Sequence, residues 1–228
     1  MIEKWSKKKI NYTLFGLFLG EGSYDNGNIT INHTDKQHFY VQWLKQLCID
    51  WKLDYNIHYT NTTLKNSEIK IYVPSRRYFD NFGRVYNKSG KKVASKFVLN
   101  RITPLGILLW YLDSGHLHVS FKGTKVKRFA YLNTISFSYQ ENQRMQQMLY
   151  NRFGISCTIH KEDFNFKSLK KKVHYRLYFN ATHFKIFYDL VREYLKILPK
   201  EFKYKFNMQY VPNMTNLSDE YTLNYNCD

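Results

Sequence analysis

The sequence predicts an α+β protein built from two copies of one αββαββα unit. Residues 14–22 (LFGLFLGEG) and 107–115 (ILLWYLDSG) are short apolar segments that end in a glycine, with an acidic residue one or two positions before it. Each segment lies near the start of one half of the chain. After each segment, strand patterns and helix patterns follow in the same order, with similar spacing from the helix start to the next strand. The 228 residues suffice for one core or for two small subdomains that share an interface.

The two apolar segments are expected to form helices buried on every side, because apolar residues fill nearly their whole circumference. Gly16 and Gly20 in the first helix and Gly106 at the start of the second would let two backbones approach closely. We therefore expect these helices to pack against each other at the interface of two pseudo-symmetric subdomains. The expected division is an N-terminal subdomain at 1–86, a basic linker at 87–102 and a C-terminal subdomain at 103–228.

In the first half, a basic lead-in precedes the apolar helix, and Asp25-Asn26-Gly27 predicts a turn before a strand over 28–32. Thr34 and Gln37 predict a capping box at the start of the next helix. The remaining elements are expected in order as strands over 56–63 and 68–73 and a short helix that Ser75 caps.

In the second half, Thr103 and Pro104 suit the start of the apolar helix, and Ser138 with Glu141 predicts a capping box for a helix that stops at Gly154. Four strands are expected in this half: one over 116–121, a longer one that follows a basic turn at 122–127 and ends at 137, and two over 157–161 and 173–179. A helix over 182–195 and an irregular segment over 199–228 are expected to follow.

The charge predicts a polyanionic partner. The chain has 35 Lys and Arg against 18 Asp and Glu, a net charge of +17 and a pI near 9.6, which fits nucleic acid. A membrane partner is not expected, because the basic residues are spread along the chain and no stretch reaches the roughly 18 apolar residues that span a bilayer. The basic N-terminus resembles a short signal peptide, but Asn11 and Thr13 interrupt its apolar run and no small-residue cleavage site follows.

Cys48, Cys157 and Cys227 form no CxxC pair, and an odd number argues against a disulfide scaffold and a zinc site. The eight histidines show no HExxH spacing. A reducing intracellular compartment is expected. Abundant Asn, Lys, Ile, Tyr and Phe are compatible with an AT-rich genome, so a mitochondrion, a chloroplast, or a bacterial or phage cytoplasm all remain open.

The two apolar segments resemble the LAGLIDADG motif of homing endonucleases, and over residues 12–210 the chain is similar to single-chain members that carry both motifs. The resemblance implies saddle-shaped antiparallel sheets with the motif helices at their interface. It also implies a monomer that binds a long, asymmetric double-stranded DNA target, Mg²⁺ or another divalent cation such as Mn²⁺ at the DNA backbone, and an intron-encoded origin.

The resemblance assigns catalysis to the acidic residue before the final glycine, which is Glu21 in the first motif and a serine, Ser114, in the second. Asp113 keeps an acid one residue earlier. Glu21 and Asp113 are the expected metal ligands, although Glu21 is alternatively a solvated carboxylate at a helix end. Three interpretations of the second motif stay open: a weakened site that nicks one strand, a distorted helix end at which Asp113 serves, or a substitution made to prevent cleavage.

The family places a lysine near each site. By position these are Lys92 and Lys205, with Lys91 and Lys203 as rivals, and all four are alternatively plain phosphate contacts. The polar faces of the strands are expected to read bases in the major groove. The expected DNA-binding residues are Asn28, Thr30, Asn32, His58, Lys70 and Tyr72 in the first half, and His116, His118, Ser120, Lys125, Lys127, His160, His174 and Arg176 in the second.

The 20 tyrosines and 17 phenylalanines are expected in the core and the interface rather than in a base-stacking surface. The resulting hypothesis is a site-specific double-stranded DNA endonuclease that hydrolyses phosphodiesters with a divalent metal and is nicking or impaired through Ser114. The alternative is an RNA-splicing maturase, with intron RNA as a partner, or a DNA-binding protein that has the same scaffold and does not cleave. The serine at 114 favours the alternative.

Overall fold

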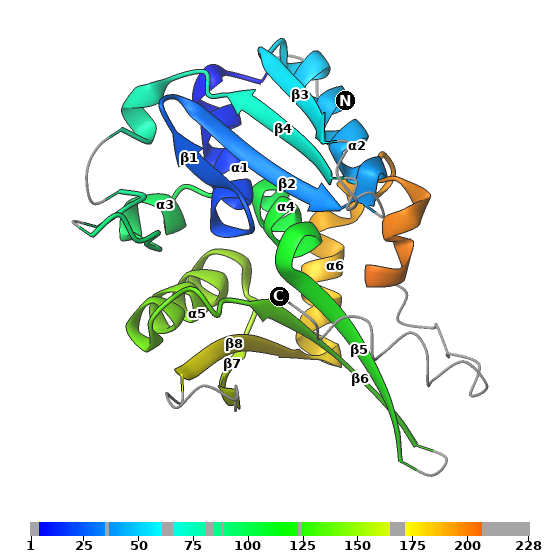
Figure 1. Ribbon diagram of the computed structural model, residues 1–228. Helices are drawn as coiled ribbons and strands as arrows, with labels where there is room; N and C mark the ends of the chain where they lie inside the picture. The colour runs from blue at the N-terminus through cyan, green and yellow to red at the C-terminus, as the bar shows by residue number, and fades with distance from the viewer. Residues whose placement is uncertain are drawn as a thin grey trace.

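In the computed structural model, two four-stranded antiparallel sheets of identical topology form the body of the protein (Figure 1). Their strand orders are β1-β2-β4-β3 and β5-β6-β8-β7, so the second sheet repeats the first. The structure describes residues 5–34, 37–60, 66–80, 84–87, 89–122, 125–164 and 172–206. The predicted α+β class and the repeated order of elements are confirmed.

The elements of the first half, including the segment that leads to the second, are α1 (Lys7–Leu19), β1 (Ser23–Asp25), β2 (Asn28–Thr34), α2 (His38–Trp51), β3 (Tyr55–Thr60), β4 (Asn66–Tyr72), the 3₁₀ turn η2 (Arg76–Tyr78) and α3 (Lys96–Leu99). Those of the second half are α4 (Pro104–Ser114), β5 (Gly115–Lys122), β6 (Lys125–Asn133), α5 (Tyr139–Phe153), β7 (Thr158–Phe164), β8 (Lys172–Asn180), α6 (Ala181–Leu195) and the 3₁₀ helix η3 (Lys200–Phe206).

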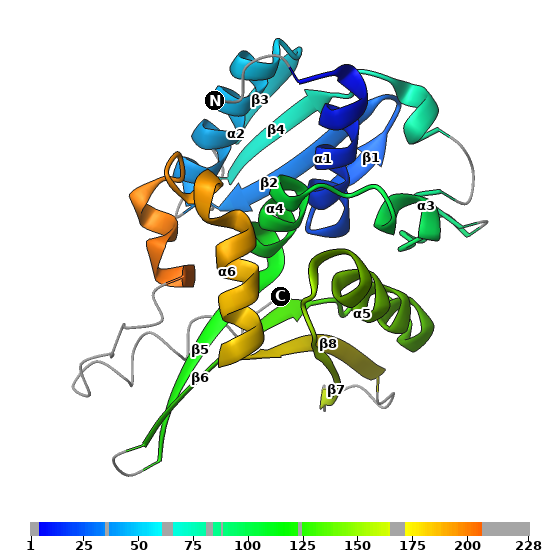
Figure 2. The same ribbon diagram turned by 180° about the vertical axis from the view of Figure 1, so that it is seen from behind.

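The two motif helices α1 and α4 pack side by side between the sheets, as expected (Figures 1 and 2). A Cβ at Gly16 would fall on the carbonyl of Gly106, so the glycines permit direct contact between the two backbones. The Thr13 and Thr103 hydroxyls share a hydrogen bond of 2.7 Å at the same level. The predicted close approach of the two helices is therefore confirmed.

The two predicted capping boxes have opposite outcomes. At α5 the box is complete, because the Ser138 hydroxyl accepts from the Glu141 N–H and the Glu141 carboxylate accepts from the Ser138 N–H. At α2 the prediction is wrong: Thr34 is the last residue of β2, where it pairs with Asn66, and α2 begins after Gln37 without a side-chain cap. Strand pairing uses the residue that the local pattern assigns to the cap. Ser75 also makes no capping hydrogen bond at η2.

The segment expected to be a linker is ordered by contacts with α5. Ser95 caps α3, and Val98 and Leu99 are buried. The buried Ala94 N–H donates to the Glu141 carboxylate at 2.9 Å. The division into subdomains itself stays a prediction.

The segment after α6 returns to the first half. The Trp43 indole on α2 donates to the Ile197 carbonyl at 3.0 Å, and Phe39 packs edge-on against Phe202 of η3. Residues 200–206, expected to be irregular, thus form a 3₁₀ helix, and 207–228 lie outside the described residues.

Each sheet has one face covered by helices, α2 on the first sheet and α5 with α6 on the second (Figure 2). The apolar side chains of the strands alternate toward these helices, as Ile29 and Ile31 do on β2 and Ala130 and Leu132 do on β6. The opposite faces carry the polar and aromatic alternates described below. Within the described residues, no helix is long and apolar enough to cross a membrane.

Candidate active site and nucleic-acid interface

The C-terminal ends of the two motif helices meet at one point, where the Glu21 backbone N–H donates to the Asp113 carboxylate at 2.6 Å. Glycine at position 20 makes this contact possible, because a Cβ there would collide with the Asp113 carboxyl group. The acid of the second motif is therefore directed across the interface and holds the backbone of the first motif.

The second oxygen of Asp113 lies 3.2 Å from Nε2 of His33, and the Asp113 side chain is fully enclosed. Burial and, next, the negative charge of Asp113 raise the pKa of Tyr40 well above its ordinary value. His33 is not among the residues expected at the site from the sequence. Its signal was the alternation of β2, where His33 follows Ile29 and Ile31 on the inward face and puts an imidazole where an apolar residue is expected.

A lysine side chain reaches each helix end. Lys92 Nζ donates to the Gly20 carbonyl at 2.8 Å, and Lys205 Nζ donates to the Leu112 and Gly115 carbonyls at 2.6 and 2.9 Å. The rival residues Lys91 and Lys203 have exposed side chains. Burial lowers the pKa of Lys92, and it lowers the pKa of the buried Lys205 to about 8.

Glu21 reaches solvent, with protein around the rest of its side chain. Partial burial raises the pKa of this carboxyl group, and the negative charge of Asp113 raises it further, while the positive charge of Lys92 acts in the opposite direction. The two carboxylates and the two lysines balance in formal charge, and Glu21 is the carboxylate of this group that is exposed to solvent and open to an added ligand.

Ser114, at the position that corresponds to Glu21, turns back onto its own helix. Its hydroxyl donates to the Trp110 carbonyl at 3.0 Å, and the residue is 7% exposed. The second helix end thus lacks a solvent-accessible carboxylate in the register where the first helix end has one.

A divalent metal ion fits the Glu21 end of this arrangement. The Glu21 carboxylate makes no hydrogen bond to another described residue, and Mg²⁺ and Mn²⁺ prefer oxygen ligands. In the described part of the chain, no group of three His, Cys, Asp or Glu side chains is close enough to enclose a metal. Water and substrate phosphates would complete the coordination, as is usual for Mg²⁺.

The outer face of the first sheet is polar. The strand registers place Asn28 opposite Tyr72, Thr30 opposite Lys70, and Asn32 and His58 opposite Glu68. All six expected residues of this half lie on that face. Asn56 and Glu68 share it, although the sequence analysis did not name them.

The outer face of the second sheet is aromatic. His116 and His118 on β5 lie opposite Tyr131 and Phe129 on β6, and six rings from four strands form one continuous surface. His118 stacks on Phe129 with ring centroids 4.6 Å apart, and His160 stacks on Tyr178 at 4.5 Å. The six are His116, His118, Phe129, Tyr131, His160 and Tyr178. The assignment of the aromatic residues to core and interface was incomplete, because the alternation of β6 and β8 directs three of them outward.

The imidazoles on β5 are uncharged near neutral pH. Burial, followed by the charge of the nearby Lys205, lowers the pKa of His116 to about 4, and burial lowers that of His118. On the same face, Arg176 lies opposite His160 and forms an ion pair of 3.0 Å with Glu162, which lies opposite His174. Ser120, Lys125 and Lys127 belong to β5 and β6, but their side chains lie outside the described residues.

Comparison with known families gives a match to the model of the LAGLIDADG DNA endonuclease family over residues 12–187, which is most of the chain. The chain belongs to this family.

Among solved structures, the homing endonuclease I-WcaI bound to its DNA recognition sequence has the same fold, with a TM-score of 0.64 and 20% identity over 88% of this chain and 86% of that one. As a LAGLIDADG protein, the chain is also similar to curated sequences. It is 30% identical over 124 residues to the cytochrome b mRNA maturase bI2 of Saccharomyces cerevisiae. The aligned region covers 46% of this chain and 27% of the maturase.

A second relative is a probable intron-encoded endonuclease 1 of Wickerhamomyces canadensis, 31% identical over 128 residues, with 56% of this chain and 50% of that protein covered. The LAGLIDADG chain therefore spans a quarter to a half of the length of these two curated relatives.

Proposed function

We propose that this chain is a site-specific endonuclease that hydrolyses phosphodiesters in double-stranded DNA. One observation carries the proposal: the two motif helices end together at Glu21, Asp113, Lys92 and Lys205, between two sheet faces that no described helix covers. A two-stranded ribbon fits the major groove, and the net charge of +17 favours contact with phosphates.

In this proposal Glu21 would hold Mg²⁺ or Mn²⁺, which when bound would stabilise charge on a DNA phosphate and lower the pKa of bound water. The chain's own residues position this ligand: Asp113 fixes the Glu21 N–H, His33 fixes Asp113, and Lys92 fixes the Gly20 carbonyl. With both oxygens engaged, Asp113 acts first as a positioning residue. Its expected role as a metal ligand requires one of these contacts to open.

The two DNA strands are proposed to be cut at unequal rates. Glu21 presents a carboxylate at one helix end, whereas the Ser114 hydroxyl at the other end is bonded to the Trp110 carbonyl. A neutral hydroxyl is a poor ligand for Mg²⁺ compared with a carboxylate. The favoured product is therefore a nick, followed by slow or absent cleavage of the second strand.

The second candidate function is that of a maturase without DNA cleavage, which the similarity to the bI2 maturase and the serine at 114 both favour. A plasmid assay separates the two. A target selected from a randomised duplex library by binding is placed on supercoiled DNA and incubated with the full chain and Mg²⁺ or Mn²⁺. Open circles support the nicking endonuclease, linear product means that the second site is also active, and intact supercoiled plasmid that the protein still binds supports the maturase.

We further propose that the protein acts as a monomer on an asymmetric target. One chain already contains both motif helices and both sheets, and the two outer faces differ in chemistry. A symmetric target would meet a polar surface on one half-site and an aromatic surface on the other.

A further inference from the structure

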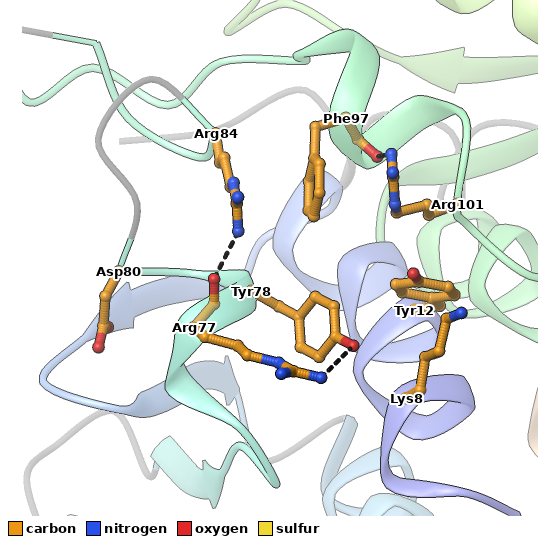
Figure 3. A pocket seen from close by; sticks show the side chains of 8 residues that line it. All are labelled: Lys8, Tyr12, Arg77, Tyr78, Asp80, Arg84, Phe97 and Arg101. Carbon is orange, nitrogen blue, oxygen red and sulfur yellow. Dashed lines mark hydrogen bonds between the residues drawn. The ribbon is translucent and has the colours of Figure 1, made fainter.

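A basic pocket opens beside the N-terminal part of α1, away from the helix ends that form the active site. Its volume is about 620 Å³, and Figure 3 shows the side chains that line it. It is lined by Lys8, Tyr12, Arg77, Tyr78, Asp80, Arg84, Phe97 and Arg101, which come from α1, the η2 region and the segment around α3. Four cationic side chains and one carboxylate make it strongly selective for anions.

Two of the guanidinium groups are held in place. Figure 3 shows Phe97 between Arg84 and Arg101, whose guanidinium carbons lie 4.1 and 4.0 Å from the ring centroid. Arg84 donates to the Arg77 carbonyl at 2.5 Å, and Arg101 donates to the Phe97 carbonyl at 3.2 Å. Each donation occupies one N–H, and the remaining donors stay available for a ligand.

The other two cations are also placed over aromatic rings. Lys8 Nζ lies 5.8 Å from the Tyr12 centroid, and Arg77 lies 5.0 Å from that of Tyr78. Neither cation is paired with a carboxylate in the described residues, and both side chains are exposed. The pocket thus contains positive charge that is ordered by rings and carbonyls and is not neutralised within the described parts of the protein.

Asp80 adds a hydrogen-bond acceptor to this basic site. One of its carboxylate oxygens accepts from the Tyr24 hydroxyl, and the residue is exposed. A carboxylate next to a phosphate is unfavourable, but it can accept a hydrogen bond from a ribose 2′-hydroxyl, which DNA does not have. This combination of donors for phosphate and an acceptor for a hydroxyl matches the backbone of RNA.

The position of the pocket separates its ligand from the DNA at the active site. Lys8 and Glu21 lie at opposite ends of α1, about 20 Å apart at a helical rise of ~1.5 Å per residue. Duplex DNA has a persistence length of about 150 base pairs, so a duplex at the Glu21 end does not readily bend back to this pocket. A second, flexible strand can enter a concave site.

We propose that this pocket binds the phosphate–ribose backbone of single-stranded RNA, at a site separate from the one that holds duplex DNA. Binding is independent of cleavage, so the proposal stands or falls separately from the endonuclease activity.

The test measures binding of a fluorescently labelled 20-nucleotide RNA to the full chain by anisotropy at several salt concentrations. The variant Lys8→Gln/Arg77→Gln removes two charges from exposed positions of the pocket, where substitutions have little effect on stability. The matched control Lys185→Gln/Lys196→Gln removes two exposed charges from the α6 region. Thermal melting of each variant verifies folding.

We expect the pocket variant to bind RNA roughly tenfold more weakly, with a salt slope lower by about 1.4 for two lost phosphate contacts, and the control to lose less than twofold. DNA of the same sequence should bind wild-type protein more weakly than RNA, and Asp80→Asn should reduce this difference. Equal losses in the pocket variant and the control would overturn the site, and equal affinity for RNA and single-stranded DNA would overturn the RNA assignment.

Plasmid nicking by Lys8→Gln/Arg77→Gln is measured in parallel and is expected to equal that of the wild type. If the wild-type chain nicks DNA while the pocket variant and the control lose RNA affinity equally, only the RNA site is refuted. A chain that binds RNA through the pocket but leaves plasmid intact refutes only the endonuclease.

Discussion

The two motif helices pack side by side but end differently: α1 ends at Leu19, so Glu21 lies beyond the helix, whereas α4 continues through Ser114. At the end of α1, Glu21 presents a carboxylate to solvent while its N–H is held by Asp113. At the end of α4, Ser114 is bonded to Trp110 of its own helix, and Asp113 is committed to the other half. The second motif therefore supports the geometry of the first. Asp113 makes a structural contact with the Glu21 backbone, and the position of the second motif that corresponds to Glu21 is a serine.

The outer faces of the two sheets show the same divergence on an identical topology. The first carries mainly amides, hydroxyls and the charged pair Lys70 and Glu68, and the second carries six aromatic or imidazole rings beside the Arg176–Glu162 ion pair. Amides and hydroxyls read bases through hydrogen bonds, whereas the ring surface adds flat contact area, as from Phe129 toward a thymine methyl group, to the hydrogen bonds that its imidazole and phenol groups can make. The two half-sites of the target are thus expected to be read by different kinds of contact.

The largest effect is expected for Glu21→Gln, which removes the solvent-accessible carboxylate at the end of α1 and keeps the shape of the side chain. We expect nicking to fall roughly a hundredfold or more, because the ligand for the divalent ion is lost. Rates are measured on the supercoiled target, with Glu193→Gln on α6 as the control. Unchanged nicking in Glu21→Gln would mean that this helix end is not the active one.

The second test places an acidic residue at position 114 of α4, which corresponds to Glu21 in the first motif. Ser114→Asp should increase the ratio of linear to open-circular product roughly tenfold, because a carboxylate in this register can ligate a metal. Ser114→Ala removes only the hydroxyl and should keep the nicked product. If Ser114→Asp leaves the ratio unchanged, the two motifs do not correspond in the assumed register.

The sheet faces are compared through affinity for the duplex target at several salt concentrations. Phe129→Ala should weaken binding about fivefold with little change in salt slope, because it removes apolar contact area. Lys70→Gln should reduce the slope, by at most about 0.9, because it removes one positive charge from the surface that faces the DNA. Indistinguishable salt slopes for the two variants would show that the faces bind DNA in the same way.

The smallest effect is a pH dependence of the second helix end. Because burial lowers the pKa of Lys205 to about 8, its ammonium group is lost as pH rises through that value, and its hydrogen bonds to the Leu112 and Gly115 carbonyls lose their charge. The Lys205 charge also acts on Glu21, so nicking at the Glu21 end should fall about twofold by pH 8 relative to pH 7. Lys205→Arg, which stays charged, should lack this decline. The same decline in that variant would assign it to another group.

Much of this arrangement could be predicted from sequence because it depends on local or repeated patterns. The pairing of the motif helices follows from their all-round apolar character and from Gly16 and Gly106, and the strand orders repeat because the αββαββα pattern repeats. Lys92 and Lys205 were selected by resemblance, and the structure brings both to the helix ends.

What sequence did not reveal depends on contacts between distant residues. The direction of Asp113 is decided by Gly20 and His33, which lie far from it in the chain. The capping box predicted at Thr34 is absent because pairing with Asn66 takes that residue into β2. A local pattern does not show whether a residue such as Thr34 will cap a helix or pair with another strand, because the second option depends on contacts made only in the folded chain.

The contact between Gly16 and Gly106 has a consequence for protein engineering. At this point the two backbones touch directly, so the glycines set the spacing of the halves, and only a few side chains, among them Thr13, Thr103 and Asp113, bridge the interface nearby. Halves from different family members that keep both glycines should therefore be exchangeable as modules. A chimera of this kind would combine the polar reading surface of this chain with a second half that supplies its own acid.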